Sequence, residues 1–278
     1  MRNIFGYNQT QTEEAPVDGQ VFLRATVPEY HRQQLKQHVE AMNCIVKKLV
    51  FWPHILLEFI LGIPGFGLLF ISRYAQGALS YTLLVIGIVC LAGMFLVIYL
   101  DSLRSKSILE STEFDTLKAN AKSLSNTSRI LLDIPAETAD LDVLIFPYKV
   151  KNGRKKPADK NQDYTNLPMS AWVENAELIL ADDAEKFAIP LSSITAVRRR
   201  KGKVKVFMWK KDDAPKSPTY KPYKIKYEAD RNIFTLRAVY ALEIAHDGEM
   251  YQLLVPEYDW DLVLEPLIGS CVPDPVMG

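Results

Sequence analysis

Two apolar stretches separated by six residues constrain this chain more than any other feature. Residues 49–71 and 78–100 are each 23 residues long, and the second carries no charged side chain. About 20 apolar residues span the ~30 Å hydrocarbon core of a bilayer. The pattern therefore predicts a two-helix transmembrane hairpin over 49–71 and 78–100. The alternative is a buried hairpin in a soluble protein.

The first apolar stretch contains residues that transmembrane helices usually avoid. Pro53 and Pro64 predict a helix that is either kinked or partly re-entrant. Glu58 lies ~13 Å along this helix at 1.5 Å per residue, and His54, one turn earlier, is expected to reach it. An ionisable group at such depth is a functional hypothesis by default. We interpret His54 and Glu58 as an intramembrane polar pair that serves a helix–helix or subunit contact, or else as a proton or ion site.

Basic residues flank the hairpin on the side of both termini. They are Lys36, Lys47, Lys48, Arg104 and Lys106, whereas the connecting segment 72–77 holds only Arg73. Because the flanks richer in Lys and Arg stay in the cytoplasm, we expect a multi-pass protein of the bacterial inner (cytoplasmic) membrane with both termini cytoplasmic. Apolar stripes of helical period at 28–48 and 114–124 predict flanking helices. These helices form a stalk with each other or pair with a partner's helices, or the first of them lies on the membrane surface.

The chain changes character on both sides of this helical region. Residues 1–27 are polar, which predicts an N-terminal tail, and 28–126 form the helical membrane region. Residues 127–278 carry short β-rich runs separated by turn residues, which predicts a soluble domain. The predicted fold class is an α+β membrane protein with a cytoplasmic, bent antiparallel β-sheet closed by a C-terminal helix.

Turn residues divide this soluble domain into strands. Residues 141–150 read as one strand, and Lys201-Gly202-Lys203 reads as a turn between two strands. Asp247-Gly248 between two apolar runs is a strong hairpin signal. Residues 259–269 are expected to form the closing helix, with Asp259 as its N-cap.

The sequence of this domain resembles GRAM-type and bacterial pleckstrin-homology-like (PH-like) domains. Residues 172–197, WVENAELILADDAEKFAIPLSSITAV, contain an apolar strand, a charged turn and then Ile-Pro-Leu followed by Ile194 and Val197. The ending DGEMYQLLVP before a last helix is also similar, and the resemblance covers about 140 residues. It implies a strongly bent seven-stranded sheet closed at one end by the helix, and binding rather than catalysis. Insertions at 151–168 and 210–222 depart from a minimal domain.

The hairpin itself is similar to a family of short bacterial two-helix membrane domains. The similarity rests on the Gly/Pro-rich run Gly62-Ile63-Pro64-Gly65-Phe66-Gly67 and on Arg73-Tyr74 and Gly77 near the turn. Here the turn is one residue longer than in that family. The resemblance implies membrane anchoring.

Charge is balanced overall but unevenly placed. Lys and Arg number 33, as do Asp and Glu, which excludes a histone-like polyanion binder. Residues 149–226 hold 19 basic against 9 acidic side chains, whereas residues 243–278 hold eight acidic and no basic ones. The candidate lipid- or partner-binding residues are Lys151, Arg154, Lys155, Lys156, Arg198, Arg199, Arg200, Lys201, Lys203 and Lys205. They form a solvated face, contact anionic lipid headgroups, or dock an acidic partner or the acidic C-terminal segment.

Sequence signatures of catalysis are absent. There is no Walker loop, nucleophile elbow or zinc-protease motif, and the three cysteines lack metal or disulfide spacing. We expect no enzyme activity, cofactor, metal site or nucleic-acid partner. The sequence predicts a membrane-anchored interaction protein whose PH-like domain binds membrane lipids or a protein partner, with a homo-oligomer also expected. The alternatives are an accessory or assembly subunit of a larger membrane complex and a small oligomeric transporter that uses Glu58.

Overall fold

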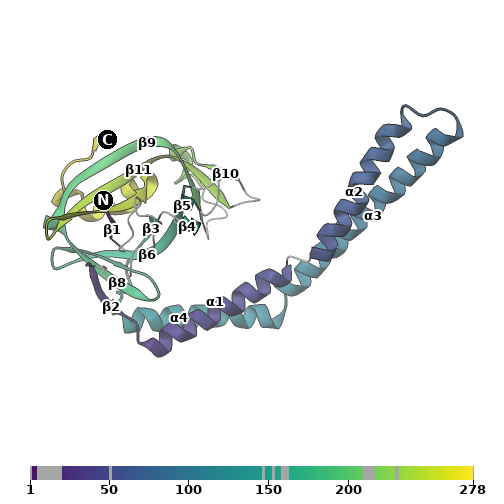
Figure 1. Cartoon of the computed structure of the whole chain (residues 1–278). Coiled ribbons are helices and arrows are strands. Elements are labelled where there is room, and N and C mark those ends of the chain that lie inside the picture. The colour runs from purple at the N-terminus through teal and green to yellow at the C-terminus, as the bar shows by residue number, and fades with distance from the viewer. Residues whose placement is uncertain are drawn as a thin grey trace. The chain divides into compact units, whose positions relative to one another are not determined.

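The chain is described by a computed structural model in two units. Described are residues 2–4, 21–49, 52–145, 148–151, 154–157, 163–208, 217–228 and 232–277, without the side chains of residues 2, 3, 46, 52, 148–151 and 154–157. One unit contains Pro28–Thr127, and the other joins Met1–Val27 to Ser128–Gly278. Figure 1 shows a helical unit and a β-rich unit.

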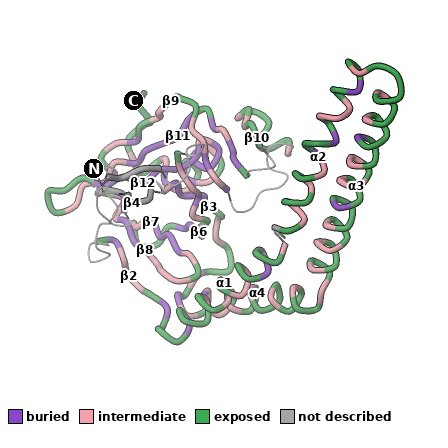
Figure 2. Tube along the Cα trace, turned by 45° about the vertical axis from the view of Figure 1, so that its right-hand side comes forward, coloured by how far each residue is buried: buried purple, intermediate pink, exposed green. Residues whose placement is uncertain are grey.

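The helical unit is built from four helices. They are α1 (Glu29–Leu49), α2 (Trp52–Ser72), α3 (Ala78–Leu109) and α4 (Thr112–Leu131). Two helical runs, Glu29–Ser72 and Ala78–Leu109, are long and apolar enough to cross a membrane by length and composition. Only 17% and 11% of their most apolar windows are buried, and most of this hairpin is exposed or intermediate in Figure 2. This exposure is unlike the core hairpin of a soluble protein, whose apolar side chains are covered.

The first span, expected to be either kinked or partly re-entrant, is a single helix in the structure. α2 is helical from Trp52 to Ser72 with Pro64 inside it. Pro53 lies in the first turn of α2. Backbone N–H groups in the first turn of a helix have no intrahelical acceptor, so a proline there removes no hydrogen bond of the helix. Pro64 removes only one intrahelical hydrogen bond, and the apolar residues on both sides continue the helix.

Glycines let α2 and α3 approach closely. A Cβ built on Gly65 would lie 2.9 Å from Leu91 Cδ2, and one built on Gly87 would lie 3.1 Å from the Gly65 carbonyl oxygen. Small residues at a helix–helix contact allow such an approach because no side chain separates the backbones.

Replacing Gly87 by leucine is expected to weaken the hairpin by about 1–3 kcal/mol, the usual cost of overpacking a close contact. The matched control is Gly67→Leu, because a Cβ at Gly67 meets no atom within 4 Å. Thermal loss of helical circular dichroism in detergent measures both variants. Equal midpoints for the two would contradict the close approach at Gly87.

The helices α1 and α4 lie side by side in an antiparallel arrangement (Figures 1 and 2). Lys48 Nζ at the end of α1 lies 3.1 Å from Glu113 Oε1 at the start of α4. A groove between them is lined by Gln34, Gln37 and His38 of α1 and by α4 residues from Leu117 to Thr127. Among the arrangements left open by the sequence, this contact corresponds to the stalk of two helices.

The β-rich unit contains the strands of one large sheet and one separate hairpin. They are β1 (Arg2–Asn3), β2 (Leu23–Thr26), β3 (Ala139–Ile145), β4 (Tyr148–Lys151), β5 (Arg154–Pro157), β6 (Tyr164–Glu174), β7 (Glu177–Ala181), β8 (Glu185–Pro190), β9 (Ile194–Phe207), β10 (Lys226–Glu228), β11 (Ile233–His246), β12 (Glu249–Pro256) and β13 (Val276–Met277). Short 3₁₀ turns η1 (Leu191–Ser193) and η3 (Lys221–Tyr223) connect some of them. The segment 141–150, expected as one strand, is divided between β3 and β4.

The sheet is mixed rather than antiparallel. Among the described residues it runs β1-β12-β11-β9-β6-β7-β8-β2, with β10 on β11, β13 on β9 and β3 on β6. The pairs β1–β12, β6–β9 and β13–β9 are parallel, and the other pairs are antiparallel. β4 and β5 form the separate hairpin. The coarse prediction of an α+β chain with a helical N-terminal half and a β-sheet domain is confirmed.

Part of the segment expected as an N-terminal tail belongs to the sheet. β2 pairs antiparallel with β8, and β1 pairs parallel with β12. Ile4 is 0% exposed and Phe22 is 4% exposed. These apolar side chains enter the core because the backbone of their segments pairs with the strands β12 and β8. Both strands are far from residues 1–27 in the sequence.

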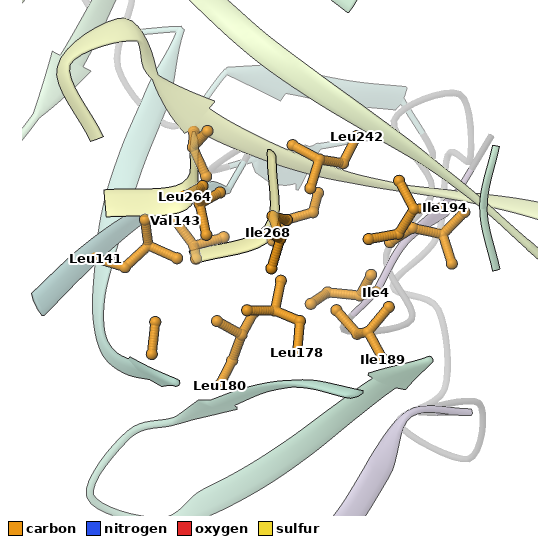
Figure 3. Close-up of a cluster of buried hydrophobic side chains, with 14 of the residues drawn as sticks. Ile4, Leu141, Val143, Leu178, Leu180, Ile189, Ile194, Leu242, Leu264 and Ile268 are labelled. Atoms are coloured by element: carbon orange, nitrogen blue, oxygen red, sulfur yellow. The ribbon is translucent and has the colours of Figure 1, made fainter. Parts of the chain in front are cut away.

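The main core lies between the sheet and the C-terminal helical segment. This segment comprises α5 (Glu257–Asp259), the π-helical turn η4 (Trp260–Leu264), α6 (Glu265–Ile268) and the 3₁₀ turn η5 (Gly269–Cys271). Figure 3 shows Leu264 and Ile268 of this segment among Ile4, Leu178 and Leu242. The predicted closing helix is thus present, but Asp259 is not its N-cap. The Asp259 carboxylate instead accepts a hydrogen bond from the backbone N–H of Asp142 at 2.8 Å.

Candidate functional site

A basic groove lies on the β-rich unit where β9, β10 and β11 meet. It has a volume of about 480 Å³ and is lined by Gly202, Lys203, Lys224, Lys226, Thr235 and Arg237. Four of these six residues are cations, and all four are exposed. The groove is therefore a candidate anion-binding site.

Strand register brings these residues to one face of the sheet. On β11, Thr235 and Arg237 alternate with the buried Phe234, Leu236 and Ala238. Thr235 is directly opposite Lys226 of β10 on one side and Lys205 of β9 on the other. Residues directly opposite each other project from the same face. Lys205 therefore extends the basic face from β9, beside Lys203.

The predicted turn at Lys201-Gly202-Lys203 is not a turn. β9 is continuous from Ile194 to Phe207. Its pairing with β11 shifts between Leu236, opposite Val204, and Ala238, opposite Lys201. This shift leaves one extra residue on β9, which is a β-bulge. The bulge absorbs Gly202 and redirects the neighbouring lysines, so the basic cluster lies on a strand and not on a protruding loop.

The groove cations keep their charge uncompensated within the described chain. None of Lys203, Lys224, Lys226 and Arg237 has a carboxylate within 4.0 Å among the described residues. Cations held together without acidic neighbours produce a positive potential that attracts anions. The Thr235 hydroxyl adds a neutral hydrogen-bond donor between them.

The three consecutive arginines contact the chain's own acceptors instead. Arg198 Nε donates to Glu243 Oε1 at 2.7 Å, and Arg200 donates to Gln252 Oε1 at 3.4 Å. Arg199 forms an ion pair with Glu257 of the acidic C-terminal segment, and this bond raises the pKa of Arg199. Arg199 thus contacts the chain's own acidic C-terminal segment, which was one of the uses considered for this group.

The other predicted basic residues fall into two groups. Lys201 is exposed on β9, next to Gly202, but is not among the residues that line the groove. Lys151 of β4 pairs through its backbone with Arg154 of β5, and Lys155 and Lys156 follow on β5. The side chains of these four hairpin residues lie outside the described part of the chain.

An acidic cluster surrounds the ion pair of Arg199 and Glu257. Burial, together with the charges of Glu257 and Glu265, raises the pKa of Asp261, although a hydrogen bond from Tyr223 opposes this change. Burial and the charge of Asp261 raise the pKa of Tyr223 to about 12. Tyr223 therefore remains a protonated donor at neutral pH.

Replacing Asp261 by asparagine is expected to stabilise the fold at neutral pH by roughly 0.5 kcal/mol, since solvent screens a half-exposed charge. The pKa of Asp261 is raised in the folded state, so the protonated Asp261 carboxyl stabilises the fold relative to the unfolded chain. This stabilisation is complete below pH 3.8 and is lost as the pH rises through the raised pKa. Asparagine keeps an acceptor for Tyr223. Urea unfolding followed by tryptophan fluorescence should show a gain at pH 7 that disappears near pH 3. A gain that persists at pH 3 would contradict this origin.

The intramembrane polar residues predicted from sequence do not pair with each other. His54 Nδ1 lies 3.0 Å from Asp101 Oδ1 of α3, so the expected contact between His54 and Glu58 was wrong. Arg104 joins this cluster, with Nη1 3.6 Å from Asp101 Oδ1 and with Nη2 donating to the Lys48 carbonyl at 2.6 Å. The acidic residue at the end of the second span thus contacts His54, and no hydrogen bond or ion pair between His54 and Glu58 occurs among the described residues.

Sequence reasoning missed Lys224, Lys226 and Arg237 as site residues. Arg237 carried a signal, since a lone cation at alternate spacing within the apolar run 233–244 marks the outer face of a strand. Lys224 and Lys226 carried none, because their position beside Arg237 depends on the pairing of β10 with β11.

No group of three or more His, Cys, Asp or Glu side chains in the described part of the chain could hold a metal ion. No family model, curated protein or solved structure matches this chain.

Proposed function

We propose that this chain is a membrane-anchored, non-enzymatic interaction protein whose β-rich unit binds anionic lipid headgroups through the basic groove. The observation that carries the proposal is the gathering of Lys203, Lys224, Lys226 and Arg237 in one groove, none of them with a carboxylate within 4.0 Å among the described residues. In the same chain two exposed apolar helices are long enough to span a bilayer. A tethered domain meets the membrane at high effective concentration, so weak contacts suffice.

In this proposal α2 and α3 anchor the chain in the bacterial inner membrane with both termini in the cytoplasm. The Lys and Arg residues that flank the hairpin support that orientation. The cytoplasmic leaflet carries the anionic lipids that attract basic surfaces. The β-rich unit would be a PH-like or GRAM-like domain, which the Ile189-Pro190-Leu191 motif and the C-terminal helical segment support.

The full chain is needed to test the proposal. β1 and β2 precede the hairpin in sequence, and Ile4 and Phe22 belong to the main core. A fragment that starts after the hairpin would lack them. The full chain is therefore placed in phosphatidylcholine nanodiscs, and its capture by floating vesicles is measured with and without phosphatidylglycerol, at low and high salt.

Capture is expected only with phosphatidylglycerol, and it should fall at high salt because the charges are exposed. The triple change Lys224→Glu, Lys226→Glu and Arg237→Glu should reduce it at least about 100-fold, since each cation contributes ~1 kcal/mol near an anionic surface. The control is Arg32→Glu, Lys36→Glu and Lys122→Glu, which changes net charge equally on the exposed surface of α1 and α4. An equal loss in both triples, or no capture by any vesicle, would refute headgroup binding by the groove.

A further inference from the structure

The basic groove is built from two rows of side chains that cross the sheet, each centred on one residue of β11. The first, the Arg237 row, consists of Lys203, Arg237 and Lys224, and all three line the groove. The pairing of β11 with β9 shifts at Arg237, which therefore faces the bulge that contains Gly202 and Lys203. Lys224 follows the turn η3 on the side of β10 and has a φ of 50°. A lysine in this left-handed region is strained, and such strain is found most often at functional sites.

The second row, the Thr235 row, consists of Lys205, Thr235 and Lys226. Thr235 is directly opposite Lys205 of β9 and directly opposite Lys226 of β10, so the three side chains project from one face of the sheet. Thr235 and Lys226 line the groove, and Lys205 extends the row beyond it. This row therefore offers two cations and, between them, a hydroxyl that can donate a hydrogen bond.

The two rows are one pleat of the strand apart. Thr235 and Arg237 are two residues apart on β11, which corresponds to about 6.8 Å along a strand. One phosphate group placed against either row leaves the cations of the other row without a counter-charge. Like charges held together repel each other, so a ligand with an anionic group on each row neutralises more of the groove than a singly charged headgroup does.

The separation of the rows selects the chemistry that joins the two anionic groups. The two phosphates of a diphosphate share an oxygen atom and are closer together than the rows. Two phosphodiesters joined through the three carbons of a glycerol can lie about one strand pleat apart. Each phosphodiester has oxygens that accept charge-assisted hydrogen bonds, and the Arg237 guanidinium can donate two such bonds to one phosphate.

We propose that the groove binds a phospholipid headgroup that contains two phosphodiesters joined by a glycerol bridge, with one phosphate on the Arg237 row and the other on the Thr235 row. This inference rests on the proposed binding of anionic headgroups by the groove. It adds the class of headgroup and a role for each row.

Cardiolipin, which has this headgroup, is the probe for the test. The full chain in phosphatidylcholine nanodiscs is captured by floating phosphatidylcholine vesicles that contain either cardiolipin or phosphatidylglycerol, matched in zeta potential. Cardiolipin vesicles should capture the chain at least about 10-fold better, because a second charged phosphate accepts hydrogen bonds in the groove. Equal capture by the two vesicles would overturn this inference and leave headgroup binding in place. Absence of capture by either vesicle would refute the proposed function as well.

Single variants separate the two rows from a general effect of charge. Lys226→Gln and Arg237→Gln remove one cation from each row, and each should reduce the preference for cardiolipin about 5-fold or more, the effect of one cation beside an anionic lipid. Lys226→Arg keeps the cation and should keep the preference. The matched control is Lys201→Gln, which removes the same charge from an exposed position on β9 that does not line the groove.

The control should lower capture by both vesicles to the same extent and leave the preference unchanged. Far-ultraviolet circular dichroism of each variant checks that the β-rich unit is folded, as expected for changes at exposed side chains. A preference that survives either groove variant, or that falls as much in Lys201→Gln, would overturn the two-row site.

Discussion

Trp260→Ala is expected to destabilise the β-rich unit by about 3–5 kcal/mol, the usual range for removing a large buried aromatic side chain. Trp260 is 2% exposed and stacks on Tyr240, with ring centroids 5.1 Å apart and planes at 12°. Its neighbours Leu264 and Ile268 are fully buried in the main core. Truncation therefore leaves a cavity where the C-terminal segment meets β11, between Trp260 and the Tyr240 ring on which it stacks.

Leu262→Ala is the matched control, because Leu262 lies on the same π-helical turn and is 43% exposed. Its cost should be below about 1 kcal/mol, since little apolar area leaves the core. Urea unfolding followed by far-ultraviolet circular dichroism measures both in the full chain. A cost for Trp260→Ala no larger than that for Leu262→Ala would show that the segment does not close the core.

Asp142→Ala should cost about 2–5 kcal/mol, because it leaves two buried donors without their carboxylate acceptor. Asp142 accepts from Tyr258 at 3.1 Å and from Asn166 at 3.1 Å, and all three are nearly inaccessible. Burial and the charge of Asp142 raise the pKa of Tyr258 well above its ordinary value, so the phenol remains a donor. The network connects β3, β6 and α5.

The control for this prediction is Asp140→Ala, two residues earlier on β3 and exposed. It should change the unfolding free energy by less than about 0.5 kcal/mol. Asp142→Asn should fall between the two, since its amide keeps one acceptor oxygen. If Asp142→Ala unfolds at the same denaturant concentration as Asp140→Ala, the network contributes nothing to stability.

The order of the main elements could be predicted because it depends on neighbours in sequence. Two apolar runs long enough to cross a bilayer are helical in almost any apolar setting, since every backbone group is then hydrogen-bonded within its own segment. Asp247-Gly248 forms the expected tight turn between β11 and β12, with φ of 48° and 78°, because these two residues tolerate the left-handed conformation.

The candidate sites depend on contacts between distant segments, and there sequence reasoning was incomplete. Lys203 was expected in a basic site, but its companions Lys224, Lys226 and Arg237 reach it only through the register of β9, β10 and β11. His54 was expected near Glu58 by helical spacing, and it contacts Asp101, 47 residues away. Spacing along the chain predicts which side chains lie on the same face of a helix or strand. It does not predict which other element packs against that face.

The sequence by itself determined the two apolar helices, the β-rich character of the C-terminal part and the Asp247-Gly248 turn, because local backbone preferences and hydrophobic period suffice for these. Only the tertiary structure decided that β1 and β2 join a sheet otherwise formed after the hairpin, that Gly202 lies in a bulge, and that Arg199 pairs with Glu257. Each of these depends on strand pairing across a long loop. The free energy of that pairing belongs to the whole sheet, and no short stretch of sequence contains it.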